Sequence, residues 1–306
     1  MTPLRQFTPV ATACLLTVAL HAAAGAKDRA AVEIPFDSVH GVVIVHVKLD
    51  GHGPFAMMLD TGADPSIVDL ATARSIGMKI ASQGGQGSGT GTDANLAYST
   101  RMEAVALGAF QARRVDAQAM DLSGLSKALG VPIQGVLGRS LMKGRVFQID
   151  YPGQVVRFYT VSPLRGRQAA PDTPRRTTLR YRYQDDLLLA GVKVDGQPAV
   201  ANLDTGSNGA FQFAPQAVGL LGLAAEQARA TPGHSTGFNG EGANRTGQVD
   251  EVDVGSLVVA HPAAVFYAKG SGRDDVGWSV RIGGAFLKDF VVTIDDVSHR
   301  VRIEKP

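Results

Sequence analysis

Short stretches of alternating apolar and polar residues, bounded by glycine-rich turns, recur along most of the chain. The period of two over 42–49 and 187–194 predicts β-strands that bury one face. Helical periodicity is confined to three brief segments, at 69–77, 122–129 and 215–221. The pattern therefore predicts a mostly β protein with few and short helices.

The order of strands and turns in the first half of the chain is repeated in the second half. Each half has an alternating strand, an Asp-Gly turn, an apolar strand ending in Asp-Thr-Gly, and a later apolar stretch closed by glycine. Four positions recur 144 or 145 residues apart, namely Asp50 and Asp195, Asp60 and Asp204, Gly138 and Gly283, and Asp150 and Asp295. Unrelated turns do not readily agree at four positions, so the sequence predicts an internal duplication.

This repeat predicts two lobes, at 27–161 and 177–306, related by a pseudo-twofold axis. The 306 residues of the chain are enough to build two hydrophobic cores. The segment 162–176 contains three prolines, which interrupt regular structure, and we expect it to be the linker.

The first 26 residues have the composition of an export signal. Arg5 supplies a positive start, 10–20 is mostly apolar, and 22–26 offers small residues for cleavage. The apolar run is too short for an ordinary bilayer-spanning helix, although a retained membrane anchor is the alternative. We expect a mature protein that starts near Lys27, is periplasmic or secreted, and has no membrane attachment after signal removal.

Charge and composition exclude several function classes. The net charge of +2 gives no reason to expect nucleic acid or an anionic membrane as a partner. The single cysteine, Cys14, lies in the export signal, so the mature chain has no thiol for disulfides, nucleophilic catalysis or metal binding. The histidines show no metal-ligand spacing. We expect no metal and no other cofactor.

The two Asp-Thr-Gly triplets are the candidate chemistry of the chain. Each carboxylate ends an apolar run, Phe55 to Leu59 before Asp60 and Ala199 to Leu203 before Asp204, and is followed by a turn that needs glycine. Two such carboxylates, brought together by the duplication, cannot both ionise at short range and share one proton. Such a pair activates a water molecule without metal or covalent intermediate.

The triplets and the segments downstream of them resemble the aspartic peptidases, the pepsin and retropepsin group. The matching segments are Asp60-Thr61-Gly62-Ala63, Asp204-Thr205-Gly206-Ser207, Val136-Leu137-Gly138 and Arg281-Ile282-Gly283. The resemblance covers nearly the whole mature chain and implies an all-β, bilobal, pepsin-like acid-protease barrel. Arg281 departs from the family pattern, which has an apolar residue at this place.

The resemblance also implies a role for each motif residue. Asp60 and Asp204 would hold the attacking water at the floor of a cleft between the lobes, one as general base and the other as general acid. Thr61 and Thr205 would hydrogen-bond across the lobe interface. The remaining residues that support the active-site loops would be Gly62, Ala63, Gly206 and Ser207. Apolar side chains would flank the scissile bond of the substrate.

Two glycine-rich stretches, 84–91 and 233–242, lie where this family carries mobile flap hairpins, although disordered surface loops are the alternative. The candidate flap residues are Gly85, Gly87, Gly89, Gly237 and Gly240. The first stretch has no tyrosine and no propeptide is evident, which favours the retropepsin side of the group. The second stretch contains a Gly-x-Ser-x-Gly match around Ser235, but it lacks the strand before it and the helix after it that a serine hydrolase requires.

We therefore expect an aspartic endopeptidase that acts as a monomer on peptide or protein substrates. A non-catalytic peptide-binding protein with the same two lobes is the alternative. Retention of both acids favours the enzyme, because a binding protein has little use for two buried carboxylates that share a proton. A dimer in which half-sites pair between chains is disfavoured by the duplication within one chain.

The two motifs differ at their fourth position, which is Ala63 in the first and Ser207 in the second. A serine hydroxyl after the glycine stabilises an ionised aspartate, whereas Ala63 does not. We expect a pH optimum that is mildly acidic to near neutral, and Ala63→Ser is expected to move the acidic limb of the pH–rate profile to lower pH. An acidic limb that stays in place in this variant would contradict the explanation.

Overall fold

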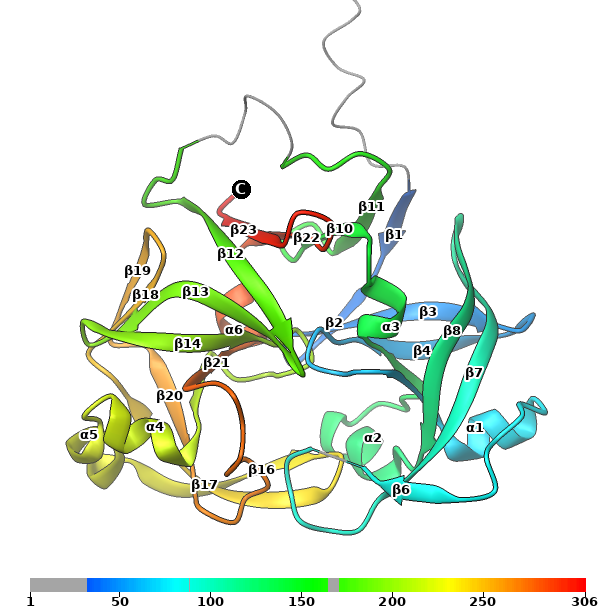
Figure 1. Cartoon of the computed structure of the whole chain (residues 1–306), viewed down its shortest axis with the longest axis horizontal. Coiled ribbons are helices and arrows are strands. Elements are labelled where there is room, and N and C mark those ends of the chain that lie inside the picture. The colour runs from blue at the N-terminus through cyan, green and yellow to red at the C-terminus, as the bar shows by residue number, and fades with distance from the viewer. Residues whose placement is uncertain (1–31, 88, 165–170) are drawn as a thin grey trace, which may run out of the picture.

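The computed structural model describes residues 32–87, 89–164 and 171–306. The predicted export signal and the middle of the predicted linker lie outside these residues. Two lobes of β-structure lie side by side, the first in blue to green and the second in green to orange in Figure 1. No helix among the described residues is long and apolar enough to cross a membrane.

The N-terminal lobe is an eight-stranded sheet in the order β2-β3-β4-β9-β5-β8-β7-β6, and an additional β3–β7 pairing closes it on itself. Its strands are β2 (Asp37–Val39), β3 (Val42–Leu49), β4 (His52–Leu59), β5 (Ser66–Asp69), β6 (Gly84–Gln86), β7 (Leu96–Leu107), β8 (Phe110–Met120) and β9 (Gly135–Leu137). Its short helices are α1 (Leu70–Ser75), α2 (Ser123–Leu129) and α3 (Arg139–Met142).

The C-terminal lobe repeats this arrangement, except that the counterpart of the long β7–β8 hairpin is interrupted and forms two shorter pairs of strands. Its strands are β13 (Asp186–Val194), β14 (Gln197–Leu203), β15 (Phe211–Phe213), β16 (Thr231–Gly237), β17 (Gly240–Gln248), β18 (Glu251–Val254), β19 (Leu257–Ala260), β20 (Ala263–Tyr267) and β21 (Val280–Ile282). Its helices are α4 (Pro215–Leu220), α5 (Ala224–Arg229) and α6 (Gly284–Leu287). β18 pairs with β13 as β7 pairs with β3.

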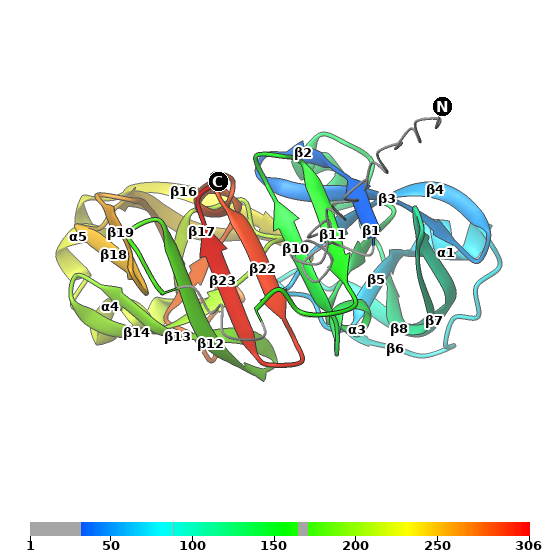
Figure 2. The ribbon, with the colours of Figure 1, turned by 90° about the horizontal axis from the view of Figure 1, so that it is seen from above.

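Six strands join the lobes, in the order β1-β11-β10-β22-β23-β12, and the pairing of β12 with β13 continues this sheet into the C-terminal lobe. The N-terminal lobe supplies β1 (Val32–Pro35), β10 (Val146–Asp150) and β11 (Val155–Tyr159), and the C-terminal lobe supplies β12 (Arg176–Gln184), β22 (Val291–Asp295) and β23 (Arg300–Glu304). Figure 2 shows these strands running side by side across the middle of the molecule. At the β10–β22 seam, Gln148 pairs with Thr293, and its Nε2 donates to Thr293 Oγ1 at 2.8 Å.

The predicted fold class is confirmed, and its physical basis is visible in β3. The side chains of Val43, Val45, Val47 and Leu49 are buried in the core, while His46 and Lys48 between them are exposed. This is the period of two that the sequence shows. The three predicted helices correspond to α1, α2 and α4. The lobe boundaries and the linker stay a prediction.

Candidate active site

The two Asp-Thr-Gly turns meet between the lobes, each at the end of a central strand. Asp60 follows β4 and donates its backbone N–H to the carbonyl of Leu137 at 3.0 Å. Asp204 follows β14 and donates in the same way to the carbonyl of Ile282 at 3.0 Å. The parallel neighbours β9 and β21 thus hold the two turns in equivalent positions. Both aspartates are buried, at 5% and 6% exposure.

Each glycine of the motif lies against the aspartate of the other lobe. Within each turn, Gly62 N–H donates to Asp60 Oδ1 at 2.7 Å, and Gly206 N–H donates to Asp204 Oδ1 at 3.0 Å. A Cβ atom added to Gly206 would lie 2.3 Å from the carboxyl carbon of Asp60, and one on Gly62 would lie 2.7 Å from that of Asp204. Side chains at these positions would therefore prevent the two acids from meeting.

The fourth motif residues fix the end of each turn. The carbonyl of Ala63 accepts from the N–H of Arg139 at 2.8 Å, and the carbonyl of Ser207 accepts from the N–H of Gly284 at 2.7 Å. Ser207 lines the cleft described below, whereas Ala63 packs in the smaller of two hydrophobic clusters. The loop residues predicted from the sequence are therefore all found around the two acids.

Thr61 and Thr205 form a reciprocal set of four hydrogen bonds across the lobe interface. The N–H of each donates to the hydroxyl of the other at 3.1 Å. The hydroxyl of Thr61 donates to the carbonyl of Leu203 at 2.7 Å, and that of Thr205 donates to the carbonyl of Leu59 at 2.9 Å. These bonds attach each turn to the strand that carries the opposite aspartate.

This arrangement predicts the effect of Thr205→Val. Valine has nearly the same shape, but it leaves the N–H of Thr61 and the carbonyl of Leu59 buried without partners. An unsatisfied buried polar group costs about 1–3 kcal/mol, so we expect the free energy of unfolding to fall by about 2–4 kcal/mol. Chemical denaturation measures this change. Thr246→Val, at an exposed position of β17, is the control and should stay close to the parent protein; equal stability of both variants would contradict the role of Thr205.

The electrostatics of the two acids are unequal. Burial, followed by repulsion from Asp204, raises the pKa of Asp60 well above its usual value. Asp204 instead has a cation beside it, because Arg281 Nε lies 3.0 Å from its Oδ2. Among the described residues, a positive charge therefore lies beside one of the two acids only, and the raised pKa of Asp60 makes Asp60 the acid that holds a proton shared by the pair.

Arg281 is the functional residue whose role the sequence analysis missed. It is the middle residue of β21 and 5% exposed, and its guanidinium lies 4.8 Å from the ring centroid of the buried Trp278. Burial would lower the pKa of Arg281, but the carboxylate of Asp204 raises it, so the group stays charged. An arginine in a buried apolar strand was the available signal, since such a charge needs a partner.

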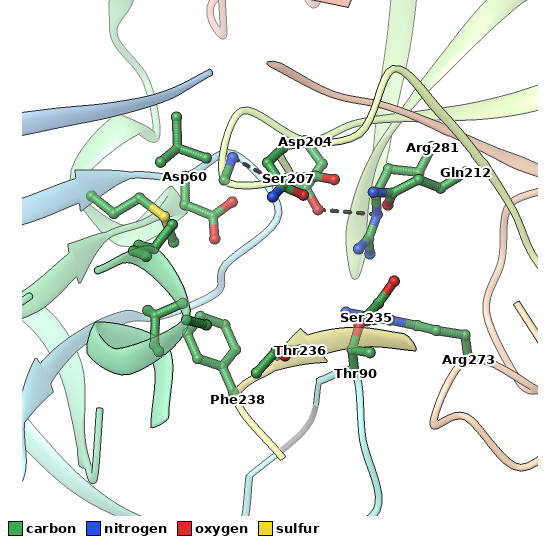
Figure 3. Close-up of a pocket in the computed structure, with 18 of the residues that line it drawn as sticks. Asp60, Thr90, Asp204, Ser207, Gln212, Ser235, Thr236, Phe238, Arg273 and Arg281 are labelled. Atoms are coloured by element: carbon green, nitrogen blue, oxygen red, sulfur yellow. Dashed lines mark hydrogen bonds and ion pairs between the residues drawn. The ribbon is translucent and has the colours of Figure 1, made fainter. Parts of the chain in front are cut away.

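A cleft of about 300 Å³ lies directly over the acids. Figure 3 shows Asp60 and Asp204 at its upper side, with Thr236 and Phe238 opposite them. The apolar wall comes mainly from the N-terminal lobe and the polar wall from the C-terminal lobe. The lining includes Val42, Met58, Leu125, Leu129 and Phe238 on the apolar side and Gln212, Tyr267, Arg273 and Arg281 on the polar side.

The cleft is covered by what we call the roof, formed by the loop 89–95 and the hairpin tip 236–240. The two parts come from different lobes and bind each other. Asn239 donates its N–H to the carbonyl of Thr90 at 3.0 Å and accepts from the N–H of Asp93 at 2.8 Å. Its side chain donates to the carbonyl of Gly87 at 2.8 Å. The backbones approach so closely that a Cβ on Gly91, whose φ is +94°, would lie 2.0 Å from the carbonyl oxygen of Asn239.

The glycines predicted as flap residues lie in and around this roof. Gly89 packs against Phe238, and Gly237 and Gly240 stand at the turn of the β16–β17 hairpin. Gly85 lies in β6 and is paired with Ala97 of β7, and a Cβ atom added to it would meet open space. Ser235 belongs to β16 and has no helix after it, so the serine-hydrolase motif is not formed. The role of the five glycines as parts of mobile flaps stays a prediction.

The described residues contain no group of three or more His, Cys, Asp or Glu side chains arranged to hold a metal ion. The arrangement that they do contain is a buried pair of carboxyl groups, an adjacent arginine and a covered cleft.

Comparison with known proteins agrees with this geometry. The family model described as aspartyl protease matches residues 45–141 and 190–293, and each stretch contains one Asp-Thr-Gly triplet. A search of curated proteins finds no match. The family model covers more than half of the chain and repeats once in each lobe, so the chain belongs to the aspartyl protease family.

Proposed function

We propose that the protein is an aspartic endopeptidase that hydrolyses peptide bonds with a water molecule activated between Asp60 and Asp204. The single observation that carries this proposal is the meeting of the two acids, each buried and each held by the glycine N–H of its own turn. Membership of the aspartyl protease family supports it.

The unequal electrostatics assign a role to each acid. Asp204, which forms the ion pair with Arg281, is the general base that takes a proton from the attacking water. Asp60, whose pKa is raised by burial, keeps its proton and donates it to the carbonyl oxygen of the scissile bond. When the tetrahedral intermediate collapses, Asp204 gives its proton to the leaving amine and one hydroxyl proton of the intermediate passes to Asp60, so the pair returns to its singly protonated state.

The roof determines how a substrate enters. The bonds from Asn239 to the loop of the other lobe close the cleft above the acids, so these bonds open before an extended peptide is bound. The backbone of the β16–β17 hairpin is then available to pair with the peptide as an additional strand.

We also propose that the protein is exported and acts as a monomer. Arg5 and the apolar run over 10–20 support export. The supply of one aspartate by each lobe of a single chain supports a monomer, because no second copy is needed to complete the site.

The test is the incubation of the mature protein with a mixed peptide library over a range of pH, with cleavage sites identified by mass spectrometry. We expect cleavage within peptides and its inhibition by a statine-type transition-state mimic. Peptide binding without cleavage at any pH would overturn the proposal in favour of the non-catalytic binding protein.

A further inference from the structure

A second arginine faces the cleft beside Arg281. Arg273 lies in the connection between β20 and β21, and its Nε donates to the hydroxyl of Thr90 in the roof at 3.0 Å. Figure 3 shows Arg281 and Arg273 on the same side of the cleft, to the right of the acids. Both line the cleft, together with Gln212, Ser235 and Tyr267.

Arg281 has a carboxylate as its ion-pair partner, whereas Arg273 has none among the described residues. Arg281 forms its ion pair with Asp204. Within the part of the chain that the structure describes, no carboxylate lies at ion-pair distance from Arg273, and its one bond is to a neutral hydroxyl. Asp186 is nearby, but its carboxylate accepts from Asn202 Nδ2 at 3.0 Å. Burial and repulsion from Arg281 lower the pKa of Arg273 to about 10, because they outweigh the attraction that Tyr267, Asp204 and Asp186 exert on its charge.

Arg281 supplies further hydrogen-bond donors on the same C-terminal wall of the cleft. Arg281 is only 5% exposed. Its Nε lies 3.0 Å from Asp204 Oδ2 but makes no well-aligned hydrogen bond. Figure 3 shows the end of its guanidinium pointing into the cleft, away from the strand that carries it. Guanidinium donors in a desolvated cleft bind carboxylates strongly and in a fixed geometry.

From these contacts we infer that the C-terminal wall of the cleft is a subsite for a substrate carboxylate, bound by Arg273 with the free donors of Arg281. The opposite wall, lined by Val42, Met58 and Leu129, is apolar. The substrate is therefore a peptide with an apolar side chain on one side of the scissile bond and a carboxylate on the other. This inference rests on the proposed peptidase function. It restricts the preference for apolar side chains, which the family resemblance implies on both sides of the scissile bond, to one side.

The carboxylate has two possible sources, an acidic side chain within the peptide or a free C-terminus. The experiment distinguishes them with three matched peptide sets. The first carries glutamate scanned through the positions on both sides of the scissile bond, the second carries glutamine at the same positions, and the third ends in either a free carboxylate or an amide. The measured quantity is the ratio of kcat/KM between the charged and the neutral member of each pair.

We expect the parent protein to prefer the charged peptide about tenfold or more at one position. Arg273→Gln is expected to bring this ratio close to one, and Arg273→Lys to retain part of it. Thr90→Val removes the roof contact of Arg273 without removing its charge, and it should keep the preference. Arg229→Gln, at an exposed position of α5, is the control for loss of an arginine on the same lobe.

Three results would overturn the inference: a ratio near one in the parent at every position, a ratio unchanged in Arg273→Gln, or a ratio lost equally in Thr90→Val. If Arg273→Gln does not fold, the parent itself provides the test, because a preference due to charge falls between low and high salt. Failure of the proposed function is recognised separately. In that case no peptide is cleaved, and the preference is measured by calorimetric binding of the glutamate and glutamine peptides.

Discussion

Replacement of Asp60 or Asp204 by asparagine is expected to lower kcat/KM for peptide cleavage by roughly a thousandfold or more. Asparagine preserves the shape of the side chain, but it neither takes a proton from water nor donates one as a carboxylic acid does. General acid–base catalysis contributes about 10²–10⁴-fold to a rate, and here both roles depend on the same pair. The measurement is steady-state kinetics of each variant on one cleaved peptide.

The pair is expected to act as a unit, so the double variant should be no slower than either single variant. Asp116→Asn is the control, because this carboxylate is exposed and forms its ion pair with Arg101 far from the cleft. Thermal unfolding establishes that each variant is folded. Retained cleavage in either single variant would remove that aspartate from the mechanism, and with it the proposed chemistry.

The second large effect is expected for Arg281→Leu, which restores the apolar residue usual at this place in the family. A cation within about 4–6 Å favours the ionised form of a carboxyl group by about 1–3 pKa units. Arg281 lowers the pKa of Asp60, against the larger effect of burial, and it lies 3.0 Å from Asp204. Its removal makes loss of each proton from the pair harder. Both limbs of the pH–rate profile should therefore move to higher pH, by about one unit or more.

The direction of this shift separates an electrostatic role from a structural one. Arg281→Lys keeps the positive charge and should leave the profile near that of the parent. Arg139→Leu breaks another largely buried ion pair, in which Arg139 Nη1 lies 3.0 Å from Asp296 Oδ1. This variant is the control for a general loss of stability. A folded Arg281→Leu variant whose limbs stay in place, or move to lower pH, would contradict the electrostatic effect of Arg281 on the two acids.

The sequence was sufficient to predict the parts of the site that local pattern determines. The apolar runs before Asp60 and Asp204 specify buried strands, and the glycine after each specifies a close approach that the structure confirms at Gly62 and Gly206. The duplication made the meeting of the two acids predictable, because equivalent turns in two similar lobes lie at equivalent places. Hydrophobic periodicity likewise predicted β3, β13 and three of the helices, α1, α2 and α4.

The remaining features depend on contacts between residues far apart in the chain, which no local pattern encodes. The binding of Asn239 to Thr90 requires knowledge of how two loops from different lobes meet. The pairing of Gln148 with Thr293 depends on strand register across the lobe interface. Arg281 was visible in the sequence only as a departure from a motif, since its partner is set by the parallel register of β14 and β21.

The residue equivalent to Arg281 in the first lobe is Val136, the middle residue of β9. In a homodimer built from one kind of half, any substitution is present twice, and the two sides of the cleft stay identical. Because both halves here belong to one polypeptide, an arginine stands beside Asp204, whereas the equivalent residue of the first lobe is a valine. Such a broken symmetry gives the catalytic centre a direction, so a bound peptide is expected to lie across it with a single N-to-C polarity.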